Sequence, residues 1–212
     1  LFLMQAMGTN RIGKIFGPAM MIWFTMIGVM GFFSLLQMPS VLKAINPIYA
    51  WNLIAKYPGG FWLLGGVFLC TTGAEALYSD LGHCGRKNIQ ISWIYIKSCL
   101  VLCYFGQAAW LMQHEGLVMG DINSFFAMMP EWMFFPAIII ATTAAIIASQ
   151  ALISGTFTLF NEAIRLNFFP RLSVHQPSEV RGQLYIPAVN WALFIACCGV
   201  VLFFKESANM EA

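Results

Sequence analysis

The sequence predicts an all-α integral membrane protein with about five transmembrane helices. Of its 212 residues, 59% are hydrophobic and 9% are charged, and the mean hydropathy is +0.74. A soluble domain has about 25% charged residues, so this chain has too few charges to cover a water-facing surface. A bilayer core of about 30 Å takes about 20 apolar residues per helix, which leaves room for roughly five spans. The composition therefore argues against a soluble enzyme, a nucleic-acid-binding protein and a disordered tail.

The first predicted span covers residues 16–38, because no charged residue occurs between Lys14 and Lys43. Pro18 is close to the start of this span, where proline is tolerated. The segment 39–60 then combines three prolines, two lysines and three Trp or Tyr residues. Because Trp and Tyr gather at the level of the lipid headgroups, we predict an extracellular loop with an interfacial helix there.

Charged segments also separate the later apolar stretches. A basic stretch at Arg86 and Lys87 ends the second stretch, and the fourth contains no charge between Glu131 and Glu162. Lys97 lies inside the third stretch, and we expect its long side chain to reach the cytoplasmic surface. The remaining predicted spans are 61–82, 91–112, 132–160 and 187–204, with a cytoplasmic loop at 161–186.

The distribution of Lys and Arg predicts the orientation. Basic residues cluster before the first span, after the second and after the fourth. The loop 114–131 contains three acidic residues and no Lys or Arg. Cytoplasmic loops carry the excess of Lys and Arg, so the first span begins in the cytoplasm and the fifth ends outside.

The second span contains the strongest functional signal. Thr71, Thr72 and Gly73 come directly before Glu75, and such a run favours local unwinding because glycine weakens a helix interior. Broken helices in transporters offer free carbonyl groups to cations near the midplane, and an intramembrane acid is a functional hypothesis by default. We therefore predict that Glu75 handles a cation or a proton. The alternative is a helix-end residue that extends to the surface or forms a structural ion pair.

Other polar residues in the spans allow two interpretations. Asp80 follows Glu75 at a spacing that puts it on another helix face, and a salt bridge at the helix end is the simpler role for it. Tyr78 could complete the site or anchor the helix at the interface. Thr143 and Ser149 could line an ion path, although small and hydroxyl residues also let helices pack closely.

No pattern predicts an enzyme or a resident cofactor. The six cysteines do not form a secreted disulfide framework, and we expect them to pack as small apolar residues. No nucleophile–base set and no metal-ligand cluster stands out, so we predict no catalytic residues and no cofactor.

The stretch TGAEALYSDLGHCGRK (72–87) closely resembles the Kup/HAK/KT family of potassium uptake permeases. The family pattern is TGAEALYADxGHFGR, and here Ser79 and Cys84 replace Ala and Phe. Five further stretches resemble the family in the same order along the chain. They are GTNRIGKIFGPAMMIWF (8–24), INPIYAWNLI (45–54), YFGQAAWL (104–111), IASQALISGTFTLFNEAIRLNFFPRL (147–172) and GQLYIPAVNW (182–191).

This resemblance implies a potassium permease of the amino acid–polyamine–cation superfamily, driven by a proton gradient. It implies a LeuT-like fold of about twelve helices with two inverted five-helix repeats. This chain would hold helices five to nine, with the broken helix at 61–82. The resemblance places K⁺ near Thr72 and Glu75, and makes K⁺ and H⁺ transported ions rather than cofactors.

We therefore predict a membrane domain over 1–212 that takes part in K⁺/H⁺ symport by alternating access in the cytoplasmic membrane. The chain starts and stops abruptly, so we expect it to be incomplete and to need the missing N-terminal helices. A potassium uniporter or channel-like permease stays open, as does a non-transporting remnant or assembly piece. The expected partners are the lipid bilayer and the two ions. A homodimer is left open, and no nucleic acid is expected.

Overall fold

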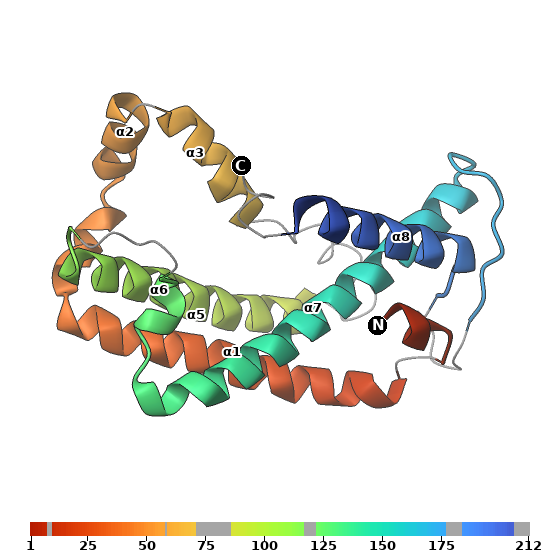
Figure 1. Ribbon diagram of the computed structural model, residues 1–212, viewed down its shortest axis with the longest axis horizontal. Helices are drawn as coiled ribbons and strands as arrows, with labels where there is room; N and C mark the ends of the chain where they lie inside the picture. Colours follow the sequence, from red (N-terminus) through yellow and green to blue (C-terminus); the bar gives the residue numbers. More distant parts are fainter. Residues whose placement is uncertain (8–9, 58, 71–85, 117–121, 177–183, 206–212) are drawn as a thin grey trace. The chain divides into compact units, whose positions relative to one another are not determined.

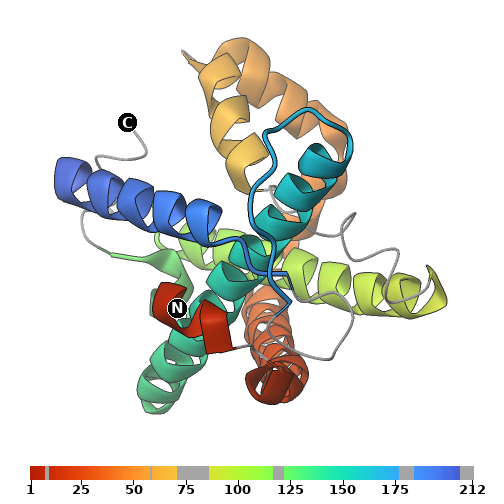
Figure 2. The same ribbon diagram turned by 90° about the vertical axis from the view of Figure 1, so that its right-hand side faces the viewer.

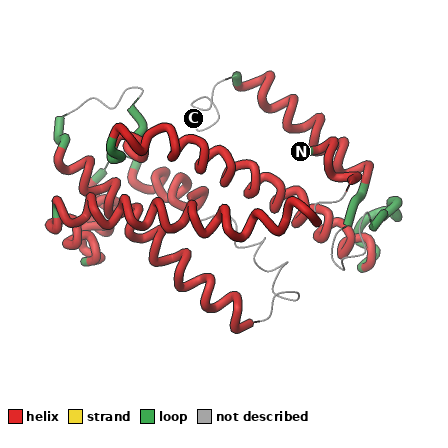
Figure 3. The backbone as a smooth tube through the Cα atoms, turned by 90° about the horizontal axis from the view of Figure 1, so that it is seen from below, coloured by secondary structure: helices red, strands yellow, loops and turns green. Residues whose placement is uncertain are grey.

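The computed structural model describes residues 1–7, 10–57, 59–70, 86–116, 122–176 and 184–205. Within these residues every regular element is a helix (Figure 3), and the one β-type pairing is an antiparallel bridge between His175 and Tyr185. In chain order the elements are η1 (Phe2–Met7), α1 (Asn10–Gln37), η2 (Pro39–Ile45), α2 (Pro47–Lys56), α3 (Gly60–Cys70), α5 (Arg86–Gln113), α6 (Ser124–Ala127), α7 (Glu131–Arg165) and α8 (Pro187–Phe204).

Four of the described helices are long and apolar enough to cross a membrane. Their candidate spans are Ile15–Gln37, Lys87–Gln113, Glu131–Arg165 and Pro187–Phe204. The predicted all-helical membrane class is therefore confirmed for the described part of the chain. The predicted span 61–82 begins with α3, but residues 71–82 lie outside the described part, so the count of five spans stays a prediction.

The start of α1 differs from the sequence interpretation in one detail. The helix begins at Asn10, so Pro18 lies in its interior and not near its start. Proline has no N–H, so the carbonyl of Lys14 lacks its usual helical donor. Membrane helices tolerate such a loss when neighbouring groups satisfy the freed carbonyl. The interruption escaped the sequence argument because the apolar run begins later than the helix does.

The described chain forms two compact units, which we treat separately. The α1–α5 unit comprises residues 17–144, and the α7–α8 unit comprises residues 1–16 and 145–212. The core of the α1–α5 unit is formed by side chains of α1, α5, the α6–α7 connection and the start of α7; Figure 1 shows how these elements are arranged. Its buried members are Met26, Ile27, Cys99, Cys103, Met129 and Ala137.

Helices α1 and α5 run parallel to each other. Thr25 contacts Tyr95 in the middle part of both helices, and Ser34 contacts Gly106 nearer their C-terminal ends. Between them, a Cβ atom added at Gly28 would lie 3.0 Å from Cys99 Sγ, and one at Gly106 would lie 2.5 Å from Gly31 Cα. Small residues at such a crossing let the backbones of membrane helices approach closely.

The α7–α8 unit has a smaller apolar core. It is built from Ile153 and Phe157 of α7 and from Ile186 and Val189 at the start of α8. Pro187 occupies the first turn of α8, where its missing N–H costs no helical hydrogen bond. The short helix η1 belongs to the same unit and contacts α8 (Figure 2).

Candidate ion-pathway residues

The residues that the sequence singles out around the helix break lie outside the described part of the chain. They are Thr71, Thr72, Glu75, Tyr78 and Asp80. On their N-terminal side α3 ends at Cys70, and on their C-terminal side α5 begins at Arg86. The break, the roles of these residues and a potassium ion near Thr72 and Glu75 therefore stay predictions.

Thr143 and Ser149 are described, and both lie on α7 with exposed side chains. Each hydroxyl donates a hydrogen bond within its own helix, from Thr143 Oγ1 to the Ile139 carbonyl at 2.8 Å and from Ser149 Oγ to the Ala145 carbonyl at 2.9 Å. A hydroxyl that donates in this way keeps lone pairs that can face a cation. The same internal bond is made by Thr142, Thr156 and Thr158, so it does not distinguish the two predicted pathway residues from their neighbours.

A pair of buried glutamines in the α7–α8 unit was not anticipated from the sequence. Gln5 of η1 and Gln150 of α7 are each 6% exposed. Gln5 Nε2 donates to Gln150 Oε1 at 2.6 Å, and Gln150 Nε2 donates to Gln5 Oε1 at 3.0 Å. The two carboxamides satisfy each other, as buried polar groups require, and they attach η1 to α7. Gln150 alone was visible in the sequence as a polar residue in an apolar run, but its partner is 145 positions away.

Asn190 forms a second polar link to η1. This residue of α8 is 1% exposed, and its Nδ2 donates to the Phe2 carbonyl at 3.2 Å. Its Oδ1 is buried without a hydrogen-bond partner. Reversing the amide would place two acceptor oxygens against each other, so the bond to Phe2 determines which way the amide points. The sequence signal would have been an asparagine at the start of an apolar span.

Hydroxyl and amide groups also connect the helices of the α1–α5 unit. The Thr25 and Tyr95 hydroxyls are 2.6 Å apart, and Ser34 Oγ donates to the Gly106 carbonyl at 2.8 Å. Gln107 of α5 accepts a hydrogen bond from Ser124 of α6 at 3.3 Å. Each bond crosses between helices, which indicates a packing role for these polar groups.

Charged and sulfur-containing side chains in α5 have structural partners. Lys97 Nζ lies 3.5 Å from the centre of the Trp93 ring, at cation–π distance. Cys99 and Cys103 are buried in the core of the α1–α5 unit, as expected for packing, whereas Cys197 and Cys198 of α8 are exposed, unlike the burial expected for all six cysteines. Among the residues that the structure describes, no group of three His, Cys, Asp or Glu side chains is placed to hold a metal ion.

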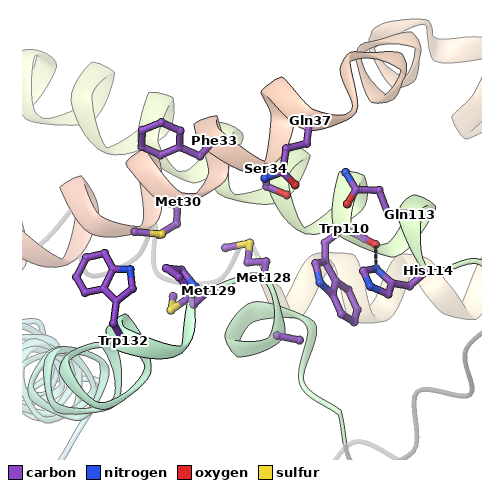
Figure 4. A pocket seen from close by; sticks show the side chains of 12 residues that line it. Met30, Phe33, Ser34, Gln37, Trp110, Gln113, His114, Met128, Met129 and Trp132 are labelled. Carbon is purple, nitrogen blue, oxygen red and sulfur yellow. Dashed lines mark hydrogen bonds between the residues drawn. The ribbon is translucent and has the colours of Figure 1, made fainter.

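The α1–α5 unit also contains a pocket with a volume of about 530 Å³ (Figure 4). It is lined by the last turns of α1 and α5 and by the segment from the end of α6 to the start of α7. Trp110 and Trp132 lie on opposite sides, with Met128 and Met129 between them. The lining residues include no Asp, Glu, Lys or Arg.

Comparisons with known proteins cover the whole chain. Residues 1–212 match the family described as the K⁺ potassium transporter integral membrane domain. The chain is 57% identical over 216 residues to the probable potassium transport system protein Kup of Flavobacterium johnsoniae and, also over 216 residues, 57% identical to that of Cytophaga hutchinsonii. It is 55% identical over 218 residues to that of Latilactobacillus sakei.

Each of these alignments includes 100% of this chain but only 32–33% of the relative. The chain thus spans about a third of the length of the curated relatives it matches. No solved structure gives a significant match.

Proposed function

Because the chain belongs to the family of K⁺ potassium transporter integral membrane domains, we propose that it is part of a transporter that takes up potassium across the cytoplasmic membrane. Membership confirms the resemblance noted in the sequence, and the relatives are named as transport proteins and not as enzymes. The observation that carries the proposal is the match over all 212 residues, together with four helices able to cross a membrane.

We further propose K⁺/H⁺ symport by alternating access in a LeuT-like fold with inverted repeats. In this mechanism the broken span at 61–82 supplies carbonyl groups and Thr71 and Thr72 hydroxyls to the cation. Glu75 takes up and releases the coupled proton, or offers its charge to the ion. Tyr78 and Asp80 support the site from the same segment. Transporter folds of this kind place such broken helices at the midplane, which supports the assignment.

The match to a third of each relative's length supports a chain that works together with further helices. Thr143 and Ser149 on α7 would then line part of the path, because their exposed hydroxyl groups keep acceptor lone pairs. In the complete transporter one group of helices would rock against the rest around a fixed cation site.

The test is rubidium uptake by the complete transporter in a potassium-uptake-deficient strain. Glu75→Gln should lower uptake by roughly tenfold or more, because an amide can neither carry a proton nor offer a charge within the membrane. Glu75→Asp, which keeps the carboxyl group, should retain part of the activity. Glu162→Gln is the matched control, since Glu162 pairs with Arg165 at 3.1 Å on an exposed surface.

Normal uptake by a correctly inserted Glu75→Gln variant would exclude Glu75 from the pathway. The alternative of a uniporter or channel-like permease is separated by proton movement. Rubidium uptake by a symporter should carry protons inward and lower the internal pH. Uptake by a uniporter should carry no protons.

A further inference from the structure

The pocket of the α1–α5 unit has a lining suited to a cation (Figure 4). Phe33, Trp110 and Trp132 contribute aromatic rings, whose faces are negative. Three methionines, Met30, Met128 and Met129, contribute flexible thioether side chains. Such side chains adapt to the shape of a ligand. No Lys or Arg lines the pocket.

Two polar groups of the lining, Ser34 and His114, already make bonds inside the protein, whereas the Gln37 and Gln113 carboxamides offer both donors and acceptors. Ser34 Oγ donates its hydrogen to the Gly106 carbonyl at 2.8 Å, so only its lone pairs remain for a ligand. His114 Nδ1 lies 2.9 Å from the Trp110 carbonyl. Because a carbonyl can only accept, Nδ1 donates in this bond, and Nε2 is the ring nitrogen that it leaves for other contacts.

The elements around the pocket also favour positive charge. Parallel helices α1 and α5 both end beside it, with no basic residue in either last turn, and the C-terminus of a helix carries partial negative charge. Exposed Glu115 and Glu131 adjoin lining residues of the pocket. Glu131 is also in the first turn of α7, where its charge offsets the positive end of that helix.

We propose that this pocket binds a small organic ammonium cation, of the quaternary or methylated class. A volume of about 530 Å³ is far larger than a metal ion needs, and hard metal ions require a close shell of oxygen ligands. Methylated ammonium groups are instead recognised by aromatic faces. His114 stacks on Trp110 with ring centres 4.3 Å apart, and both residues line the pocket.

The direct test is calorimetric titration of the complete transporter, purified in lipid nanodiscs, with choline. The matched probe is 3,3-dimethylbutan-1-ol, which has the shape of choline without its charge. We expect choline to bind roughly tenfold more tightly than the alcohol, within the range of cation–π recognition. Equal affinity of the two probes, or no choline binding at 100 mM, would overturn the proposal.

Variants locate the binding to this pocket. Trp132→Leu should weaken choline binding by about 2- to 30-fold, since one cation–π contact is worth about 0.5–2 kcal/mol. Trp62→Leu is the matched control, because Trp132 and Trp62 are 74% and 82% exposed and Trp62 lies on α3, outside the pocket lining. An equal loss in both variants would contradict the assignment.

A second pair of substitutions tests the electrostatic part without removing any aromatic ring. Glu115→Gln combined with Glu131→Gln should weaken choline binding, and the loss should shrink in high salt because surface charges are screened. Binding of the neutral alcohol should not change. Unchanged choline binding at low salt would contradict the proposed contribution of Glu115 and Glu131. None of these readouts depends on transport, so they stand or fall independently of the uptake experiment.

Discussion

At the scale of single residues, the buried amides of the α7–α8 unit carry the clearest structural information. Gln5 and Gln150 form a reciprocal pair, and Asn190 holds the Phe2 carbonyl. All three amides connect the short helix η1 to longer helices. Buried amides of this kind specify one arrangement, because any other leaves donors or acceptors unpaired. We infer that η1 has a defined place on α7 and α8.

Removing both glutamines should therefore cost less stability than the sum of the two single removals. Gln150→Leu removes both reciprocal bonds and leaves the buried Gln5 amide with only its 3.4 Å bond to the Leu1 carbonyl, which costs about 1–3 kcal/mol of unfolding free energy. The same loss is expected for Gln5→Leu. The double variant replaces both amides by apolar groups of similar size, so its loss should be smaller than the sum of the two single losses.

The measurement is thermal unfolding of the complete transporter in detergent for the two single variants, the double variant and the parent. Gln90→Leu, which replaces an exposed glutamine of α5, controls for the general effect of the substitution. Strictly additive losses would show that the two amides do not interact.

At the scale of elements, the packing of α1 against α5 depends on glycine. Gly31 of α1 and Gly106 of α5 lie at the closest approach of the two helices, where an added Cβ atom would meet backbone atoms. Backbone cannot move aside as a flexible side chain can, so the helices would have to separate. The neighbouring bond from Ser34 to the Gly106 carbonyl would lengthen as they do.

Gly106→Ala should consequently destabilise the transporter by about 1–3 kcal/mol, the usual cost of overpacking a well-packed interior. The control is Gly65→Ala in α3, where no atom lies within 4 Å of the added Cβ. There alanine should be neutral or stabilising by up to about 1 kcal/mol, since it favours the helix more than glycine does. Thermal unfolding checks both, and equal midpoints for the two variants would contradict the close crossing.

At the scale of the whole molecule, the described residues leave most of the surface of the candidate spans uncovered. Between 11% and 33% of the residues in their apolar windows are buried. Lipid or further helices must cover this surface, because a large exposed apolar patch marks a contact surface. The relatives, about three times as long as the chain, have enough additional sequence to supply such helices.

Expression of these 212 residues alone should thus give no potassium uptake. A rocking transporter needs both the moving helices and those they move against, and we propose that this chain holds only part of them. The measurement is growth of a potassium-uptake-deficient strain on low potassium, with the complete transporter as the positive control. An immunoblot of the membrane fraction shows whether the chain is inserted. Growth with the inserted chain alone would refute this requirement for further helices.

The sequence by itself determined the membrane class, the helical composition and the family. Each follows from properties that do not depend on folding partners: long apolar runs, the scarcity of charge, and the stretch around Glu75. Four helices in the described residues and the family match over 1–212 confirm these inferences. The residues around Glu75 lie outside the described part, so the roles predicted for them rest on sequence alone.

Only the tertiary structure decided which polar residues meet. Gln5 and Gln150 are hydrogen-bonded although they are 145 positions apart in the sequence, and Thr25 and Tyr95 although they are 70 apart. No local periodicity predicts such pairs. The pocket with its two tryptophans likewise depends on α1 and α5 running parallel and ending together beside the start of α7. The physical reason is that the apolar pattern of a helix predicts only that it lies away from water. Close packing and hydrogen-bond satisfaction determine which neighbour it packs against.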